Sequence, residues 1–179
     1  YKRQAQRSPD QPKFPEELAI AQDEWSESAQ AIVDDSNGAI AEAAVLSTCN
    51  RFEVYFSARD ARAAFASISQ HFQERSGLPM AELRESLFML TESDASAHAL
   101  RVSAGLDSLV VGEGQILSQM KACYANAIEG AGGKVTSRLL NTAVAAGKMR
   151  IRSVAVVPVM LAILVKDGED ADRGMAEDL

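Results

Sequence analysis

Residues 43–57 hold the pattern that most constrains the fold: an apolar run, a short polar segment and a second, alternating run. The first four residues are apolar, and Phe52, Val54 and Phe56 then alternate with more polar neighbours. A period of two indicates a strand, and a polar segment between two such runs indicates a bend. The sequence therefore predicts two strands joined by a tight connection with Cys49 at its apex.

Cys49 has neighbours that suit a reactive thiol. It stands between Thr48 and Asn50, which can donate hydrogen bonds, and two residues before the cation of Arg51. Such surroundings favour the thiolate, which is the form that attacks an acyl carbon. Free cysteines are also common as small buried side chains, so a buried thiol at a strand end fits the spacing equally well.

The bulk properties exclude several classes of protein. With 179 residues the chain can bury a core as one domain, and 47% hydrophobic and 24% charged residues are ordinary for a soluble globular protein. A net charge of −7 argues against general affinity for a polyanion, so any RNA contact needs a local basic patch. Two cysteines without a CxxC pair and two histidines predict neither a zinc cluster nor a disulfide framework. The polar, charged first residues do not form a secretory signal.

The first half of the chain alternates helical and strand patterns. Residues 1–13 lack periodicity and are predicted to be disordered. Pro15 can begin a helix, and a strand is predicted at 87–90. One helical face is predicted at Trp25, Ala29, Ile32 and Val33, and another at Ala61, Ala64, Phe65, Ile68 and Phe72, ending near Gly77.

From residue 94 onward the periodicity is helical. The predicted faces are His98, Val102 and Leu106; Ile116, Met120, Cys123, Tyr124 and Ala127; and Val135, Leu139, Ala143, Gly147 and Ile151. Cys123 belongs to an apolar stripe, which predicts a core thiol. A basic cluster at Arg138, Lys148, Arg150 and Arg152 is typical of a solvated face, with an RNA backbone contact as the alternative.

Residues 154–165 form an apolar run that Pro158 interrupts. The run is shorter than the ~20 residues that a membrane span needs, so we expect it to be buried or covered by a partner. The tail that follows is acidic and is predicted to be loose.

Two segments resemble the signatures of one enzyme family. Residues 47–53 (STCNRFE) and 103–119 (SAGLDSLVVGEGQILSQ) are similar to the two long signatures of glutamyl-tRNA reductases. The likeness extends roughly over residues 14–152. It implies an α+β fold with a ferredoxin-like N-terminal domain followed by a helical segment. In that family the first strand would be central, and since residues 1–13 do not suit a central strand, we expect the sheet to lack it.

The resemblance also implies a division of the chain. The expected parts are a non-homologous segment (1–13), a ferredoxin-like catalytic domain (14–94), the helical part of that domain with the start of a linking helix (95–153), and a divergent apolar run with an acidic tail (154–179).

By the same resemblance, the enzyme transfers glutamate from its tRNA ester to a cysteine before NADPH reduces the thioester to glutamate-1-semialdehyde, the first step of tetrapyrrole and chlorophyll synthesis. A thioester is a better hydride acceptor than an ester, so a thiolate divides one hard step into two. Cys49 is the implied nucleophile, and His98 could polarise the carbonyl or protonate the leaving oxygen; its alternative is a histidine satisfied at a helix border. The implied substrate-binding residues are Thr48, Asn50, Arg51, Ser108, Glu113 and Gln115, with Arg51 holding the glutamate carboxylate and Glu113 its ammonium group.

The resemblance implies an NADP-dependent oxidoreductase, yet no Gly-x-Gly-x-x-Gly unit occurs in the chain, so we expect it to lack an NADPH-binding domain. We therefore expect a catalytic-domain fragment, with a glutamyl-tRNA esterase or a non-catalytic tRNA- or partner-binding remnant as alternatives. No metal site is expected. Implied partners are glutamyl-tRNA, a second subunit in a homodimer and the aminomutase that acts next. The form of residues 112–117 resembles the plant and cyanobacterial branch, which favours the chloroplast stroma, or the cytoplasm outside photosynthetic eukaryotes.

Overall fold

The computed structural model describes residues 16–49, 51–106, 114–149 and 161–165. The helices are α1 (Trp25–Asp35), α2 (Ala61–Ser76), α3 (Met80–Ser86), α4 (Glu92–Ser103), α5 (Gly114–Glu129) and α6 (Lys134–Met149), with 3-10 turns at Glu16–Leu18 and Gln22–Glu24. The strands are β1 (Ile40–Ser47), β2 (Phe52–Ala58), β3 (Leu87–Thr91) and β4 (Leu161–Val165).

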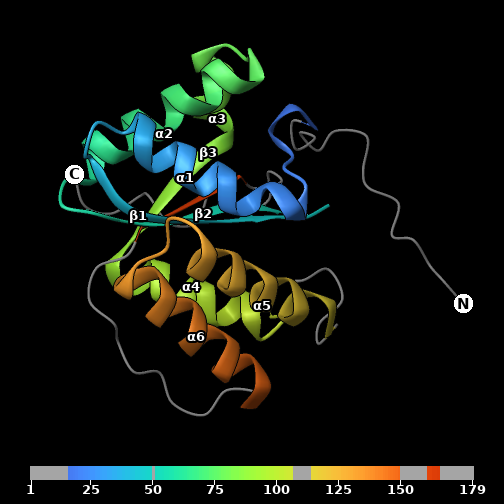
Figure 1. The fold of residues 1–179 in the computed structure, drawn as a ribbon. Helices are drawn as coiled ribbons and strands as arrows, with labels where there is room; N and C mark the ends of the chain where they lie inside the picture. Colours follow the sequence, from blue (N-terminus) through green and yellow to red (C-terminus); the bar gives the residue numbers. More distant parts are fainter. Residues whose placement is uncertain (1–15, 50, 107–113, 150–160, 166–179) are drawn as a thin grey trace, which may run out of the picture.

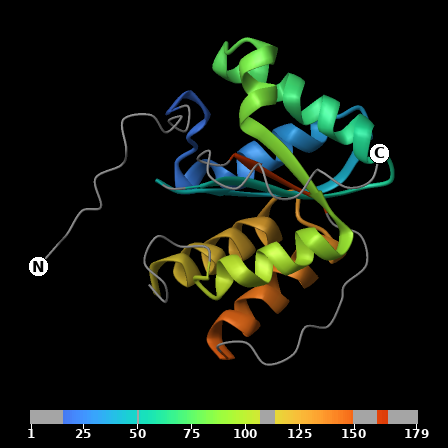
Figure 2. The ribbon, with the colours of Figure 1, turned by 180° about the vertical axis from the view of Figure 1, so that it is seen from behind.

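The described elements form three layers (Figure 1). An antiparallel sheet with the strand order β1-β2-β4-β3 lies in the middle. Helices α1, α2 and α3 cover one face, and α4, α5 and α6 cover the other, as the reversed view in Figure 2 also shows. The α+β class predicted from the sequence is confirmed.

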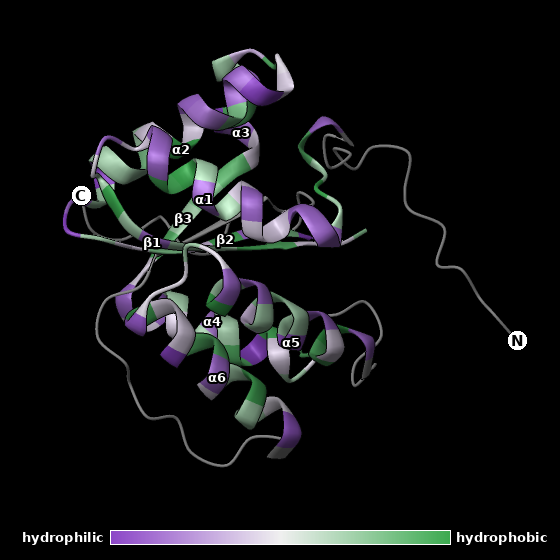
Figure 3. Cartoon of the chain, in the orientation of Figure 1, coloured by the Kyte–Doolittle hydropathy of each residue, from purple (hydrophilic) through white to green (hydrophobic). Residues whose placement is uncertain are grey.

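Both faces of β2 are buried, since each face of the sheet meets a helical layer. Phe52 to Phe56 on β2 are all buried, and the strands in Figure 3 are hydrophobic along most of their length. The largest fully buried side chains are Trp25, Tyr55, Phe52, Phe56, Phe72, Leu18, Ile32, Ile40, Leu46, Ile68, Leu83 and Met120. Successive side chains of a strand point to opposite faces, so Phe52, which packs edge-on against Phe72 of α2, marks the α1–α3 face.

Strand β4 corrects the expectation of an incomplete sheet. Leu161–Val165 lies between β2 and β3 and is antiparallel to both, with all five residues paired on each side. It thus takes the central position expected for the first strand of a β-α-β-β-α-β unit. The apolar run was predicted to be buried or partner-covered, with no strand assigned to it. Its last five residues form β4, and 154–160 lie outside the described residues.

The first helix begins later than predicted. Pro15 lies outside the described residues, and α1 begins only at Trp25. The preceding segment is tied to the sheet, because the Ile20 amide donates to Ser47 Oγ at 3.0 Å and Trp25 Nε1 donates to the Ile20 carbonyl at 3.2 Å. These bonds, together with the extended backbone at Ala21, exclude a continuous helix.

Helix α2 agrees with its prediction. Asp60 caps its N-terminus by accepting from the Arg62 and Ala63 amides, and Gly77 ends it with φ of 71°. The strand β3 was also predicted, whereas α3 was not, because Leu83 is the helix's one buried residue and gives no periodic pattern.

The second helical layer agrees with most of its predictions, while the predicted face residue Ile151 lies outside the described residues. Helices α5 and α6 bury the predicted stripes, including Met120, Cys123, Leu139 and Ala143. Leu106, however, lies beyond the end of α4 and is 47% exposed, so it does not share a helical face with Val102.

Glu42 of β1 fastens this layer to the sheet. Its Oε2 accepts from the Val135 amide at 3.0 Å, the Thr136 amide at 2.8 Å and Thr136 Oγ1 at 3.0 Å. The first amides of a helix lack partners within it, and a negative charge is favoured there, so the carboxylate caps α6. Gly133 permits this approach, because a Cβ there would lie 2.3 Å from Glu42 Oε1.

Candidate functional site

The turn that joins β1 and β2 presents Cys49 to solvent. Ser47 pairs with Phe52 at the end of the hairpin, and the Thr48 amide donates to the Arg51 carbonyl at 2.8 Å. The Arg51 amide in turn donates to Thr48 Oγ1 at 3.1 Å. Cys49 is exposed within this turn, so the predicted strand-bend-strand arrangement is confirmed and the thiol is accessible.

A buried carboxylate lies directly behind the turn. Glu53 is 1% exposed and points to the α4–α6 face of the sheet, opposite to Phe52. Its Oε1 accepts from Arg51 Nη1 at 2.7 Å and contacts His98 Nε2 at 3.0 Å, while its Oε2 accepts from the Tyr55 hydroxyl. One carboxylate therefore joins the Cys49 turn to α4.

The electrostatics of this cluster favour the ionised carboxylate. Burial alone raises the pKa of Glu53, but the positive charge and hydrogen bond of His98, the charge of Arg51 and the hydrogen bond of Tyr55 lower it to about 2. Burial and the adjacent Glu53 charge raise the pKa of Tyr55 well above its usual value, so the phenol stays a hydrogen-bond donor. Glu53 is thus an acceptor throughout the physiological pH range.

From the sequence, Glu53 was expected at most to support neighbouring groups or to cap an element, with no chemistry of its own; in the structure it links Arg51 to His98. The available signal was its position two residues after Arg51, which puts both on one face of an extended strand, with Tyr55 following at the same spacing. The face of β2 that carries Glu53 and Tyr55 is covered by α4–α6, and both side chains are buried.

The other predicted site residues divide into three groups. Thr48, Cys49 and Arg51 lie together on the turn, and His98 joins them through Glu53. Gln115 is exposed near the beginning of α5. Asn50, Ser108 and Glu113 lie outside the described residues.

Cys123 is a different kind of thiol. It is fully buried in α5, as predicted from its apolar stripe. Burial first, and then the charge of Glu53, raise its pKa far above the ordinary range. The thiol therefore stays protonated and acts as a small core side chain.

The described residues do not fit a dinucleotide or a metal. A dinucleotide site needs a glycine-rich turn between parallel strands, whereas the pairs of the described sheet are antiparallel. Among the described residues no three His, Cys, Asp or Glu side chains are grouped to hold a metal ion. No helix within the described ranges has the length and apolar character to cross a bilayer.

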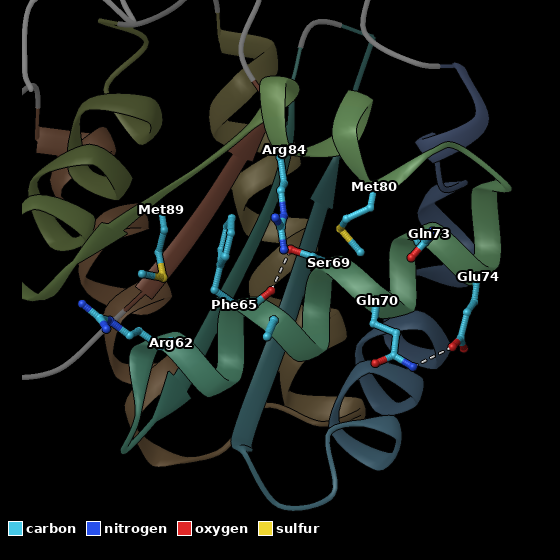
Figure 4. A pocket seen from close by; sticks show the side chains of 10 residues that line it. Arg62, Phe65, Ser69, Gln70, Gln73, Glu74, Met80, Arg84 and Met89 are labelled. Carbon is cyan, nitrogen blue, oxygen red and sulfur yellow. Dashed lines mark hydrogen bonds between the residues drawn. The ribbon is translucent and has the colours of Figure 1, made fainter.

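A pocket of about 420 Å³ lies elsewhere, on the outer side of α2 (Figure 4). Phe65, Met80 and Met89 form apolar parts of its wall, with Arg62 and Arg84 beside them. None of the predicted site residues that the structure describes lines it. The pocket opens on the α1–α3 side, whereas Glu53 points to the other face.

Comparison with known proteins identifies the family. Residues 11–154 match the family model of the N-terminal domain of glutamyl-tRNA reductase. The chain is 46% identical over 138 residues to the chloroplastic glutamyl-tRNA reductase 1 of Hordeum vulgare, covering 76% of this chain and 26% of that protein. It is 51% identical over 116 residues to the glutamyl-tRNA reductase of Synechococcus elongatus, covering 64% of this chain and 26% of that protein. The chain thus spans about a quarter of the length of these relatives, and it belongs to the glutamyl-tRNA reductase family, of which it carries the N-terminal domain.

Proposed function

We propose that this chain carries out the thioester-forming step of glutamyl-tRNA reduction. The observation that supports it is the exposed thiol of Cys49 on a tight turn, with Arg51 in the turn and His98 linked to it through Glu53. A nucleophile, a cation and an acid-base group are the parts that acyl transfer requires.

In the proposed step the Cys49 thiolate attacks the carbonyl carbon of the glutamyl ester. The new C–S bond forms as the bond from carbon to the ribose oxygen breaks. His98 first takes the proton of the Cys49 thiol and then returns it to this oxygen. The product is a glutamyl thioester on Cys49 and free tRNA. In the full-length relatives NADPH would then supply the hydride that reduces the thioester to the aldehyde, but the described residues hold no site for it.

The guanidinium of Arg51 is proposed to bind the substrate carboxylate while it also keeps its bond to Glu53. A guanidinium can grip a carboxylate through two parallel hydrogen bonds, which suits the side chain of the glutamyl group. Its Nη1 is engaged by Glu53 at 2.7 Å, so a grip on substrate is shared with this ion pair. We propose that Thr48, Asn50, Ser108, Glu113 and Gln115 complete the substrate pocket.

The alternatives differ in the fate of glutamate. An esterase would pass the thioester to water, and a non-catalytic remnant would only bind tRNA or a partner. Arg138 and Lys148 are exposed on α6, which is compatible with an RNA backbone contact.

For localisation, the barley relative is named chloroplastic and the other is cyanobacterial, so we propose the chloroplast stroma for a plant-type source and the cytoplasm otherwise.

The test uses glutamyl-tRNA with labelled glutamate, the complete 179-residue chain and its Cys49→Ser and Cys123→Ser variants. We expect labelled glutamate to become attached to the wild-type protein and to the Cys123→Ser variant, but not to the Cys49→Ser variant. Alkali or hydroxylamine should release this label from the protein. Slow release of glutamate without NADPH consumption would follow from hydrolysis of the thioester. Equal labelling of the Cys49→Ser variant, or no labelling of any variant, would refute the proposed step.

A further inference from the structure

The carboxylate of Glu53 has properties that packing does not require. It is buried at 1% exposure, and transfer of a charge from water costs several kcal/mol that its partners must offset. An apolar side chain of similar volume often serves stability equally well. What an apolar side chain cannot do is accept hydrogen bonds from Arg51 and His98 at the same oxygen.

We propose that Glu53 is a positioning residue that fixes both the ring orientation and the neutral tautomer of His98 and holds Arg51 against the Cys49 turn. This inference rests on the proposed acyl transfer and adds a residue to it. Glu53 touches neither substrate nor the reacting atoms and acts through the two side chains it holds.

The tautomer follows from the hydrogen-bond chemistry. An ionised carboxylate only accepts, so the 3.0 Å contact requires a proton on His98 Nε2. When the ring is neutral, the other nitrogen, Nδ1, then carries the lone pair.

The same carboxylate sets the position of Arg51. Its backbone is held in the turn by Thr48, and its side chain is held by the 2.7 Å bond to Glu53 Oε1. Tyr55 holds the second oxygen of Glu53, which prevents rotation of the carboxylate. The guanidinium and the imidazole are thus oriented by one group whose own position is fixed on both oxygens.

The chain contains an internal reference for the test. His71, the other of its two histidines, contacts Asp35 Oδ2 through Nδ1 at 2.8 Å, so its neutral ring should carry the proton on Nδ1. The two rings should therefore show opposite tautomers. Nitrogen-15 NMR of the ring nitrogens, recorded over a pH series up to the point where both rings are neutral by their own signals, distinguishes them without tRNA.

We expect wild-type His98 to be protonated on Nε2 by at least tenfold over Nδ1, and His71 the reverse. In Glu53→Gln both His98 tautomers should be populated, because an amide can donate to or accept from Nε2, while His71 is unchanged. A wild-type His98 with its proton on Nδ1 would overturn the proposal even if the variant failed to fold.

The kinetic arm is a double-mutant cycle on glutamyl transfer to Cys49. Glu53→Gln should slow the transfer by roughly 10²-fold in the wild-type background, but by only a few-fold in the His98→Asn background. Equal slowing in both backgrounds would show that Glu53 does not act through His98. Absence of transfer in wild type would refute the proposed function, while leaving the tautomer measurement valid.

Discussion

Replacing Ile163 with proline tests the position of β4 in the sheet. Ile163 pairs with Val54 of β2 on one side and with Met89 of β3 on the other. Proline cannot donate to the ladder and is confined to edge strands, strand starts and bulges, so it does not suit a central strand. The substitution should therefore disrupt the pairing of the two strands with β4.

The size of the effect follows from the pairing. Proline removes one ladder hydrogen bond, worth about 1 kcal/mol net, and leaves a buried carbonyl unpartnered, at about 1–3 kcal/mol. The free energy of unfolding should fall by roughly 2–4 kcal/mol, out of the 5–15 kcal/mol typical of a domain. For a domain of this size the melting temperature should fall by about 5–15 °C.

Circular dichroism with thermal and urea unfolding measures this loss, and Ile163→Val is the matched control because valine also favours strands. Hydrogen exchange adds a local readout: amides at 52–56 and 87–91 should exchange faster in the proline variant. If Ile163→Pro unfolds within about 0.5 kcal/mol of wild type, as surface substitutions do, β4 does not complete the sheet.

Four further outcomes are expected. Iodoacetamide near neutral pH should label Cys49 in the folded protein and spare Cys123, because the Cys49 thiol is exposed and burial keeps the Cys123 thiol protonated. Peptide mapping measures the labelling, and preferential labelling of Cys123 would contradict the prediction. Arg51→Lys should reduce glutamyl transfer with little change in folding, since a point charge replaces a planar fork; transfer at the wild-type rate would remove Arg51 from substrate binding. The pKa of Glu53 is lowered from 4.5 to about 2, so the ionised carboxylate should add about 3 kcal/mol to the free energy of unfolding above pH 4.5, and this gain should be lost as the pH falls toward 2. Acid unfolding of the Glu53→Gln variant should lack this part of the pH dependence. Glu42→Ala should lower the free energy of unfolding by about 1–2 kcal/mol through loss of the α6 cap, and Glu42→Gln, which keeps an acceptor, should lower it by less. Equal free energies of unfolding for both variants and wild type would contradict the capping role of Glu42.

The hairpin at Cys49 was predictable because its information is local. Alternation of Phe52, Val54 and Phe56 specifies a strand, and the polar segment before it specifies a bend. The end of α2 at Gly77 was predictable for the same reason, since a glycine after a periodic segment ends a helix.

The features that were missed depend on distant pairing. β4 contains five consecutive apolar residues without alternation, so periodicity could not distinguish a buried strand from another buried segment. Its partners lie 70 or more positions away at β3 and further at β2. The burial of Glu53 likewise depends on α4, which brings His98 from 45 positions away. No local pattern contains that contact.

The geometry of the candidate site depends on β2 more than on any other element. This strand begins at the end of the Cys49 turn, carries Glu53 one residue further, and pairs with β1 on one side and β4 on the other. Its register therefore sets the distance between the turn and the carboxylate, and the carboxylate sets the orientation of His98 from the opposite layer. A slip of one residue would turn Glu53 toward α1 and α2, away from His98, and bring Phe52 to the α4 side. The pairing that holds β2 in register is thus also what positions the Cys49 turn, Arg51 and His98 around Glu53.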